Sequence, residues 1–137
     1  MNKHEIKRNK HYAAIARRLI REKDDLAELR DSGCKVAYLS SQEEKTTGKG
    51  TRLIFGECKL VPDNLQWICP YHILIIIYEQ NCAYFTEHQL EVLIWHELKH
   101  IGISPDGADE QYYIIPHDYE EFKAIIDAEG LDWGLPE

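Results

Sequence analysis

The chain has 137 residues, a length typical of a single domain, and its hydrophobic content of 44% fits a folded globular protein. Its formal net charge is -8 at pH 7, which argues against a broad phosphate-binding surface, because nucleic-acid affinity depends largely on Lys and Arg side chains. We therefore expect one domain over residues 1–137 that is a poor candidate for nucleic-acid binding.

An amphipathic helix is predicted over His11 to Arg30, because apolar residues recur there at helical spacing between charged ones. Asp31-Ser32-Gly33 is expected to end it. Basic residues cluster in this part of the chain, namely Lys3, Lys7, Arg8, Lys10, Arg17, Arg18 and Arg21. We interpret the cluster as a solvated helix face rather than as a nucleic-acid contact.

Several strands are predicted in the middle of the chain. Lys35 to Leu39 has the composition of a strand, and the polar stretch from Ser40 to Gly50 is expected to be an exposed loop. Thr51 to Phe55 and Cys58 to Val61 are also predicted strands, with Gly56 as a bulge between them.

His72 to Tyr78 (HILIIIY) is predicted to be a strand covered on both faces, because it is rich in β-branched residues and lacks polar alternation. The sequence Thr86-Glu87-His88-Gln89 matches a capping box, which predicts a helix that runs to about Ile101 and is ended by Gly102. Tyr112 to Ile115 is a short candidate strand.

A second capping box, Asp118-x-x-Glu121, predicts a C-terminal helix that ends near Gly130. The order of these elements predicts an α+β fold, in which helices pack on a small, twisted, mostly antiparallel sheet. We thus expect an N-terminal helix, a central helix and a C-terminal helix.

The central helix carries ionisable groups on a surface that is otherwise apolar, within LIWHELKHIG (residues 93–102). Its apolar stripe consists of Leu90, Leu93, Ile94 and Ile101. Glu97 falls inside this stripe, and burying an unpaired carboxylate costs several kcal/mol unless a cation compensates. His96 and His100, four residues apart, project side by side at the edge of the stripe, within reach of one metal ion.

One explanation accounts for all three residues. A Zn²⁺ ion held by both imidazoles would supply positive charge beside Glu97, which could then take a proton from the metal's water. The alternative is that the histidines are ordinary core residues and that Glu97 pairs with Arg52 or Lys99.

A catalytic zinc site normally has three protein ligands, so a third ligand is expected from elsewhere in the chain. Gly102 is expected to let the chain turn away from the helix and fold back toward it, so the third ligand is expected downstream of Gly102. The candidates there are His117, Asp118, Glu120 and Glu121. We favour His117, with Glu121 as the alternative ligand. Asp118 is expected to be a helix N-cap, or else an acceptor that orients a ligating imidazole.

A hydrolase also needs a donor that stabilises the oxyanion formed when water attacks a carbonyl. Tyr112, Tyr113 and Tyr119 are the nearest candidates in the sequence, which does not choose between them.

The four cysteines, Cys34, Cys58, Cys69 and Cys82, form no C-x-x-C pair, so we expect buried free thiols rather than a zinc knuckle or a redox motif. The N-terminal sequence has no apolar run of the kind found in signal peptides, and Ile73 to Tyr78 is too short to span a bilayer. A cytoplasmic protein with no membrane partner is expected.

Six segments occur in an order that resembles the phage metallopeptidase family, a small zincin-like domain carried by bacteriophages and prophages. They are IARRLI, KVAYLSS, GKGTRLIFGECKLVP, HILIIIY, LIWHELKHIG and PHDYEEFKAIIDAEGLDW, and the resemblance extends from about Ile15 to Trp133. It implies a zincin-like fold, with His96 and His100 as metal ligands, Glu97 as catalytic base and His117 as third ligand. The family has an acidic residue ahead of the hydrophobic strand, where this chain has Tyr71-His72, so no role is carried over to those positions.

The leading prediction is therefore a zinc-dependent hydrolase, a metallopeptidase of the H-E-x-x-H type that acts on a peptide or protein. A catalytically silent protein that uses a zincin scaffold to dock on a host protein is the alternative. Nucleic-acid association through the basic first helix is the weakest of the three hypotheses.

Overall fold

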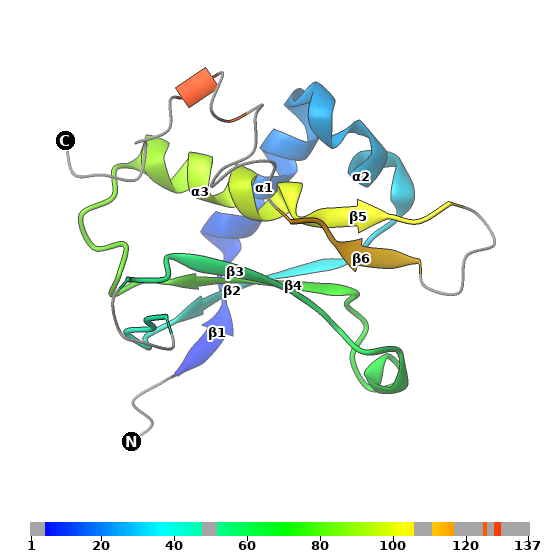
Figure 1. Cartoon of the computed structure of the whole chain (residues 1–137), viewed down its shortest axis with the longest axis horizontal. Coiled ribbons are helices and arrows are strands. Elements are labelled where there is room, and N and C mark those ends of the chain that lie inside the picture. The colour runs from blue at the N-terminus through cyan, green and yellow to red at the C-terminus, as the bar shows by residue number, and fades with distance from the viewer. Residues whose placement is uncertain (1–4, 48–51, 106–110, 117–124, 126–127, 130–137) are drawn as a thin grey trace.

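The computed structural model describes residues 5–47, 52–105, 111–116, 125 and 128–129, which form an α+β fold (Figure 1). Within this part of the chain, no helix combines the length and the apolar character that crossing a membrane requires. The elements in chain order are β1 (Ile6–Arg8), α1 (Lys10–Glu22), η1 (Asp24–Leu26), α2 (Ala27–Ser32), β2 (Val36–Ser41), β3 (Gly56–Leu60), η2 (Asp63–Leu65), β4 (Ile73–Tyr78), α3 (Glu87–Lys99), β5 (Ile101–Ile103) and β6 (Tyr112–Ile114).

Four strands form a mixed sheet in the order β1-β2-β4-β3. The β1·β2 and β3·β4 pairs are antiparallel, and the central β2·β4 pair is parallel. Two of the three pairings therefore match the expected antiparallel arrangement. Strands β5 and β6 form a separate antiparallel pair. Helices α1 and α3 lie on the same face of the four-stranded sheet (Figure 1).

Strand β4 lies inside the sheet, and side chains on both of its faces are buried, as the sequence predicts. Ile73, Ile75 and Ile77 are at most 1% exposed and pack in the core with residues of α1 and α3. On the opposite face Ile76 and Tyr78 are also buried. Each buried Ile contributes about 1.5–3 kcal/mol relative to an exposed one, so this strand anchors the fold.

The predicted helix from His11 to Arg30 is divided in the structure. α1 ends at Glu22, because Lys23 has an extended backbone, and η1 and α2 follow it. The break is held by Asp25, whose Oδ2 accepts a hydrogen bond from Trp95 Nε1 at 3.2 Å and contacts Lys99 Nζ at 3.2 Å. The predicted end of the helical segment is confirmed, because Gly33 follows α2 with a φ of 75°.

The predicted strand from Thr51 to Phe55 is wrong in its described part. Residues Arg52 to Phe55 form no strand, and Leu53 makes one isolated β-bridge, with Thr46. This segment runs beside Lys45, because the Asn81 side chain donates hydrogen bonds to the carbonyl oxygens of both Lys45 and Ile54 at 2.8 Å. The strand begins at Gly56, which pairs with Ile77 and forms no bulge. The expected loop also starts later, since Ser40 and Ser41 are buried residues of β2.

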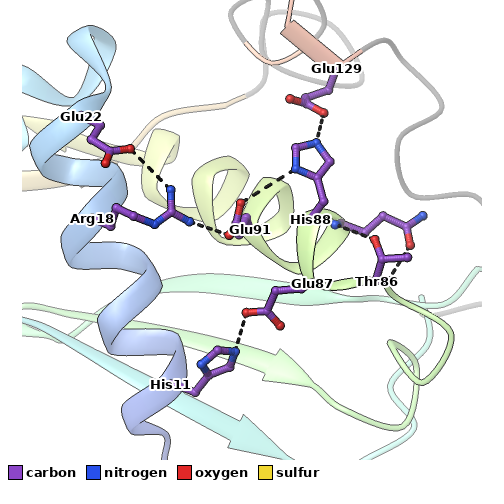
Figure 2. Close-up of polar contacts among 9 residues, drawn as sticks. His11, Arg18, Glu22, Thr86, Glu87, His88, Glu91 and Glu129 are labelled. Carbon is purple, nitrogen blue, oxygen red and sulfur yellow. Dashed lines mark hydrogen bonds and ion pairs between the residues drawn. The ribbon is translucent and has the colours of Figure 1, made fainter.

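Polar contacts fix α3 against α1 (Figure 2). Arg18 Nη2 lies 2.6 Å from Glu91 Oε1, and His11 Nε2 lies 2.6 Å from Glu87 Oε1. The capping box at Thr86 and Gln89 is present as predicted. Among the other side chains of α3, His88 is exposed, whereas those of Val92 to Trp95, Glu97 and Leu98 are buried.

Candidate metal centre

The last turn of α3 brings together His96, Glu97 and His100. One ligand atom from each of these residues lies within 4.8 Å of the others, which is close enough for a shared metal ion. His96 Nε2 is 3.9 Å from Glu97 Oε2, and the two imidazole rings have centroids 5.0 Å apart with an angle of 73° between their planes. Glu97 is 3% exposed, whereas both histidines are half-buried. The cluster predicted from helical spacing is therefore present in the structure.

His100 is oriented by Ile115, the residue that follows β6. Its Nδ1 lies 2.7 Å from the carbonyl oxygen of Ile115, and the Ile115 N–H donates to the carbonyl of His100 at 2.6 Å. Because a carbonyl oxygen can only accept, Nδ1 carries the ring proton and the lone pair of the neutral ring lies on Nε2. Ligating histidines in metalloproteins are commonly fixed in this way by a backbone carbonyl.

Glu97 reaches the sheet at Gly56, the first residue of β3. A Cβ atom at position 56 would lie 3.2 Å from Glu97 Oε2 and equally close to the backbone oxygen of Ile76. The glycine thus leaves room for the carboxylate between helix and sheet. The sequence interpretation assigned Gly56 to a bulge and missed this contact, because the approach of a helix to a strand leaves no signal in the strand itself.

The thiols near the cluster are protonated at neutral pH. Burial and the charges of Glu79 and Glu97 raise the pKa of Cys82 to about 12. Burial, with a smaller contribution from Glu97, raises the pKa of Cys58 as well. All four cysteines are free, as expected, but they are half-buried rather than fully buried. Within the described residues, the side chains whose ligand atoms converge at the site are the two imidazoles and the carboxylate, and no thiol belongs to this group.

Gly102 does not end α3, contrary to the prediction. The helix ends at Lys99 with His100 as its C-cap, and Gly102 lies in β5 opposite Tyr113 without a positive φ. A Cβ atom at position 102 would lie 2.5 Å from Cζ of the Tyr113 ring, far inside contact distance. The glycine is needed because the Tyr113 ring covers it.

Replacing Gly102 by Ala is therefore expected to lower the free energy of unfolding by about 1–3 kcal/mol, since the Tyr113 ring must move. Urea unfolding of the variant measures this change. The control is the same replacement made in a Tyr113→Ala protein, where the added methyl group meets no ring and should cost much less. An equal cost in both proteins would contradict the assigned contact.

Tyr112 and Tyr113, two of the candidate oxyanion donors, make contacts with residues outside the His96, Glu97 and His100 cluster. The Tyr112 hydroxyl donates to the carbonyl of Ser32 at 3.4 Å, and its ring packs against His72. Tyr113 covers Gly102 and is 44% exposed. Tyr119 lies outside the described residues, as do His117, Asp118, Glu120 and Glu121, among which the third ligand was predicted.

His88 lies on the surface, as its helical position suggests, and contacts Glu91 and Glu129 (Figure 2).

These observations define a small α+β domain with a two-histidine, one-carboxylate cluster on a core helix. A family model described as "Putative phage metallopeptidase" matches residues 4–135, and the chain belongs to this family. Comparisons with curated proteins and with solved structures give no match. Membership agrees with the resemblance seen in the sequence and implies a metal ion.

Proposed function

We propose that the protein is a zinc-dependent peptidase with a zincin-like fold, in which His96 and His100 bind the metal and Glu97 is the general base. The observation that carries the proposal is the placement of a 3% exposed carboxylate beside two imidazoles whose ligand atoms lie within 4.8 Å of it. A positive charge at that point would stabilise the buried carboxylate. Glu97 also favours an enzyme over a silent scaffold, because a purely structural zinc site needs no base beside a water position.

The donor set suits Zn²⁺, which prefers imidazole nitrogen and carboxylate oxygen and is typically held by three protein ligands in catalytic sites. We propose His117 as the third ligand and Glu121 as the alternative. The support for His117 is the pair of hydrogen bonds that joins Ile115 to His100. Two residues span at most about 7 Å, so a side chain two positions after Ile115 is within reach of the site.

Zn²⁺, when bound, polarises the substrate carbonyl and lowers the pKa of a coordinated water to about 7. Glu97 accepts a proton as water attacks the carbonyl carbon and then delivers it to the amine nitrogen as the C–N bond breaks. The Ile115 carbonyl keeps His100 in the tautomer that can ligate.

The proposal is tested by removing and restoring the metal. Protein purified without a metal-affinity tag is expected to cleave members of a peptide library, to lose this activity with 1,10-phenanthroline, and to recover it with Zn²⁺. Mass spectrometry of the library reports cleavage and its position. Cleavage that continues unchanged after complete removal of metal would contradict the mechanism.

A further inference from the structure

A cavity away from the metal centre lies where β1 runs into α1 beside β2, and its lining includes no residue of α3. Its volume is about 350 Å³, within the range of about 300–1,000 Å³ that is usual for small-molecule sites. β1 pairs only with Leu39 to Ser41, so the first half of β2 extends beyond the end of β1. A hydrogen bond from Asn9 N–H to the Tyr38 carbonyl, at 2.9 Å, joins two residues of its lining, and the cavity opens to solvent. The lining residues include Arg8, Lys10, Ala13, Arg17, Val36 and Tyr71.

The lining carries three cations, Arg8, Lys10 and Arg17, and no carboxylate. Within the described residues none of the three forms an ion pair, although the chain as a whole has a net charge of -8. Two neighbouring basic residues on α1 do contact carboxylates. Arg18 contacts both Glu22 and Glu91, and His11 contacts Glu87 (Figure 2). The acidic residues of the protein thus neutralise the side of α1 that faces α3 and leave the cavity positive.

The three cations are exposed, and Arg8 makes a contact that restricts its side chain. The Arg8 guanidinium lies over the Tyr71 ring at 5.2 Å from its centroid, a cation–π contact that fixes the side chain. Lys10 is the first residue of α1, whose first turn contains no acidic residue, so the positive end of the helix dipole adds to the same field. Like charges gathered in this way repel one another, and an anion bound between them relieves that repulsion.

We propose that this cavity binds a small phosphorylated molecule, with its phosphate between Arg8, Lys10 and Arg17. A phosphate group carries about -1.5 to -2 charges, and Arg binds its oxygens through two parallel hydrogen bonds. Ala13, Val36 and the edge of Tyr71 provide apolar contact for the rest of the ligand. The small volume and the acidic character of the whole chain favour a small molecule over a nucleic-acid backbone.

The test is calorimetric titration of the full chain with two probes, inorganic phosphate and adenosine monophosphate. Both are expected to bind, and the nucleotide more tightly, because it also fills the apolar part of the cavity. Arg17→Gln is expected to weaken the binding of both about tenfold, the effect of losing one charge-assisted contact. The matched control is Arg21→Gln, which removes the same charge from the same helix outside the cavity and should change binding less than about twofold.

Arg8→Gln, in β1, provides a second variant should the α1 replacement disturb folding, and the same tenfold loss is expected. Equal weakening by Arg17→Gln and Arg21→Gln would show general electrostatic attraction and would overturn the proposal. So would the absence of binding by either probe at about millimolar concentration. A single-stranded oligonucleotide that binds far more tightly than the nucleotide, with a steep salt dependence, would also overturn it in favour of nucleic acid.

Discussion

Replacing Glu97 by Gln is expected to lower kcat by about 10²- to 10⁴-fold, which is the usual contribution of a general acid–base. The amide has nearly the shape of the carboxylate, so it fits the space left by Gly56, but it cannot accept the proton from water. Because Glu97 is proposed as base and not as ligand, the zinc content should stay at the wild-type value. Steady-state kinetics on a cleaved library peptide and elemental mass spectrometry measure the two quantities.

Glu87→Gln is the matched control for this experiment. Glu87 belongs to the same helix, is exposed, and contacts His11 rather than the cluster. Its replacement should leave kcat within about twofold of wild type, because exposed ion pairs contribute little. Wild-type turnover by the Glu97→Gln protein would show that Glu97 is not the general base. A loss of zinc from that variant would show that Glu97 is a metal ligand.

Replacing His100 by Ala is expected to abolish stoichiometric zinc binding and, with it, hydrolysis. Mutating a residue that merely orients a ligand weakens metal binding by about 10- to 100-fold, so removing the ligand itself should cost more than about 100-fold. The variant also loses the hydrogen bond from Nδ1 to the Ile115 carbonyl. Competition with a fluorescent zinc chelator measures the affinity.

His88→Ala is the control for His100→Ala. His88 lies on the same helix, its side chain is 64% exposed, and its contacts are with Glu91 and Glu129. Zinc affinity and kcat should both be unchanged by its replacement. A His100→Ala protein that binds zinc as tightly as the His88→Ala protein would exclude His100 from the metal site.

The parts of the fold that the sequence predicted well are those with strong local signals. The capping box at Thr86 positions the start of α3, and the unbroken apolar run of β4 predicts a buried strand. The wrong predictions concern segments whose conformation depends on contacts with residues far away in the sequence. The first helix ends before Lys23, next to Asp25, which accepts a hydrogen bond from Trp95 of α3. The segment before β3 is positioned by hydrogen bonds from Asn81. Such contacts cannot be read from the segment that they rearrange.

The same distinction applies to the site. His96, Glu97 and His100 were found because an i, i+4 pattern on one helix fixes their mutual geometry. The roles of Gly56, in β3, and of the Ile115 carbonyl, just after β6, were missed, because both residues reach the site only through the tertiary fold. Gly102 was assigned to the wrong role, since a glycine after a helix commonly ends it, whereas here the residue makes room for Tyr113. His117 remains a prediction.

Anomalous diffraction at the zinc absorption edge, on crystals grown with zinc, locates the metal ion. We expect one strong peak per chain, about 2.0–2.1 Å from the Nε2 atoms of His96 and His100, with the Glu97 carboxylate beside it. Ordered imidazoles without a peak between them, or a zinc ion bound only by other residues, would contradict this expectation.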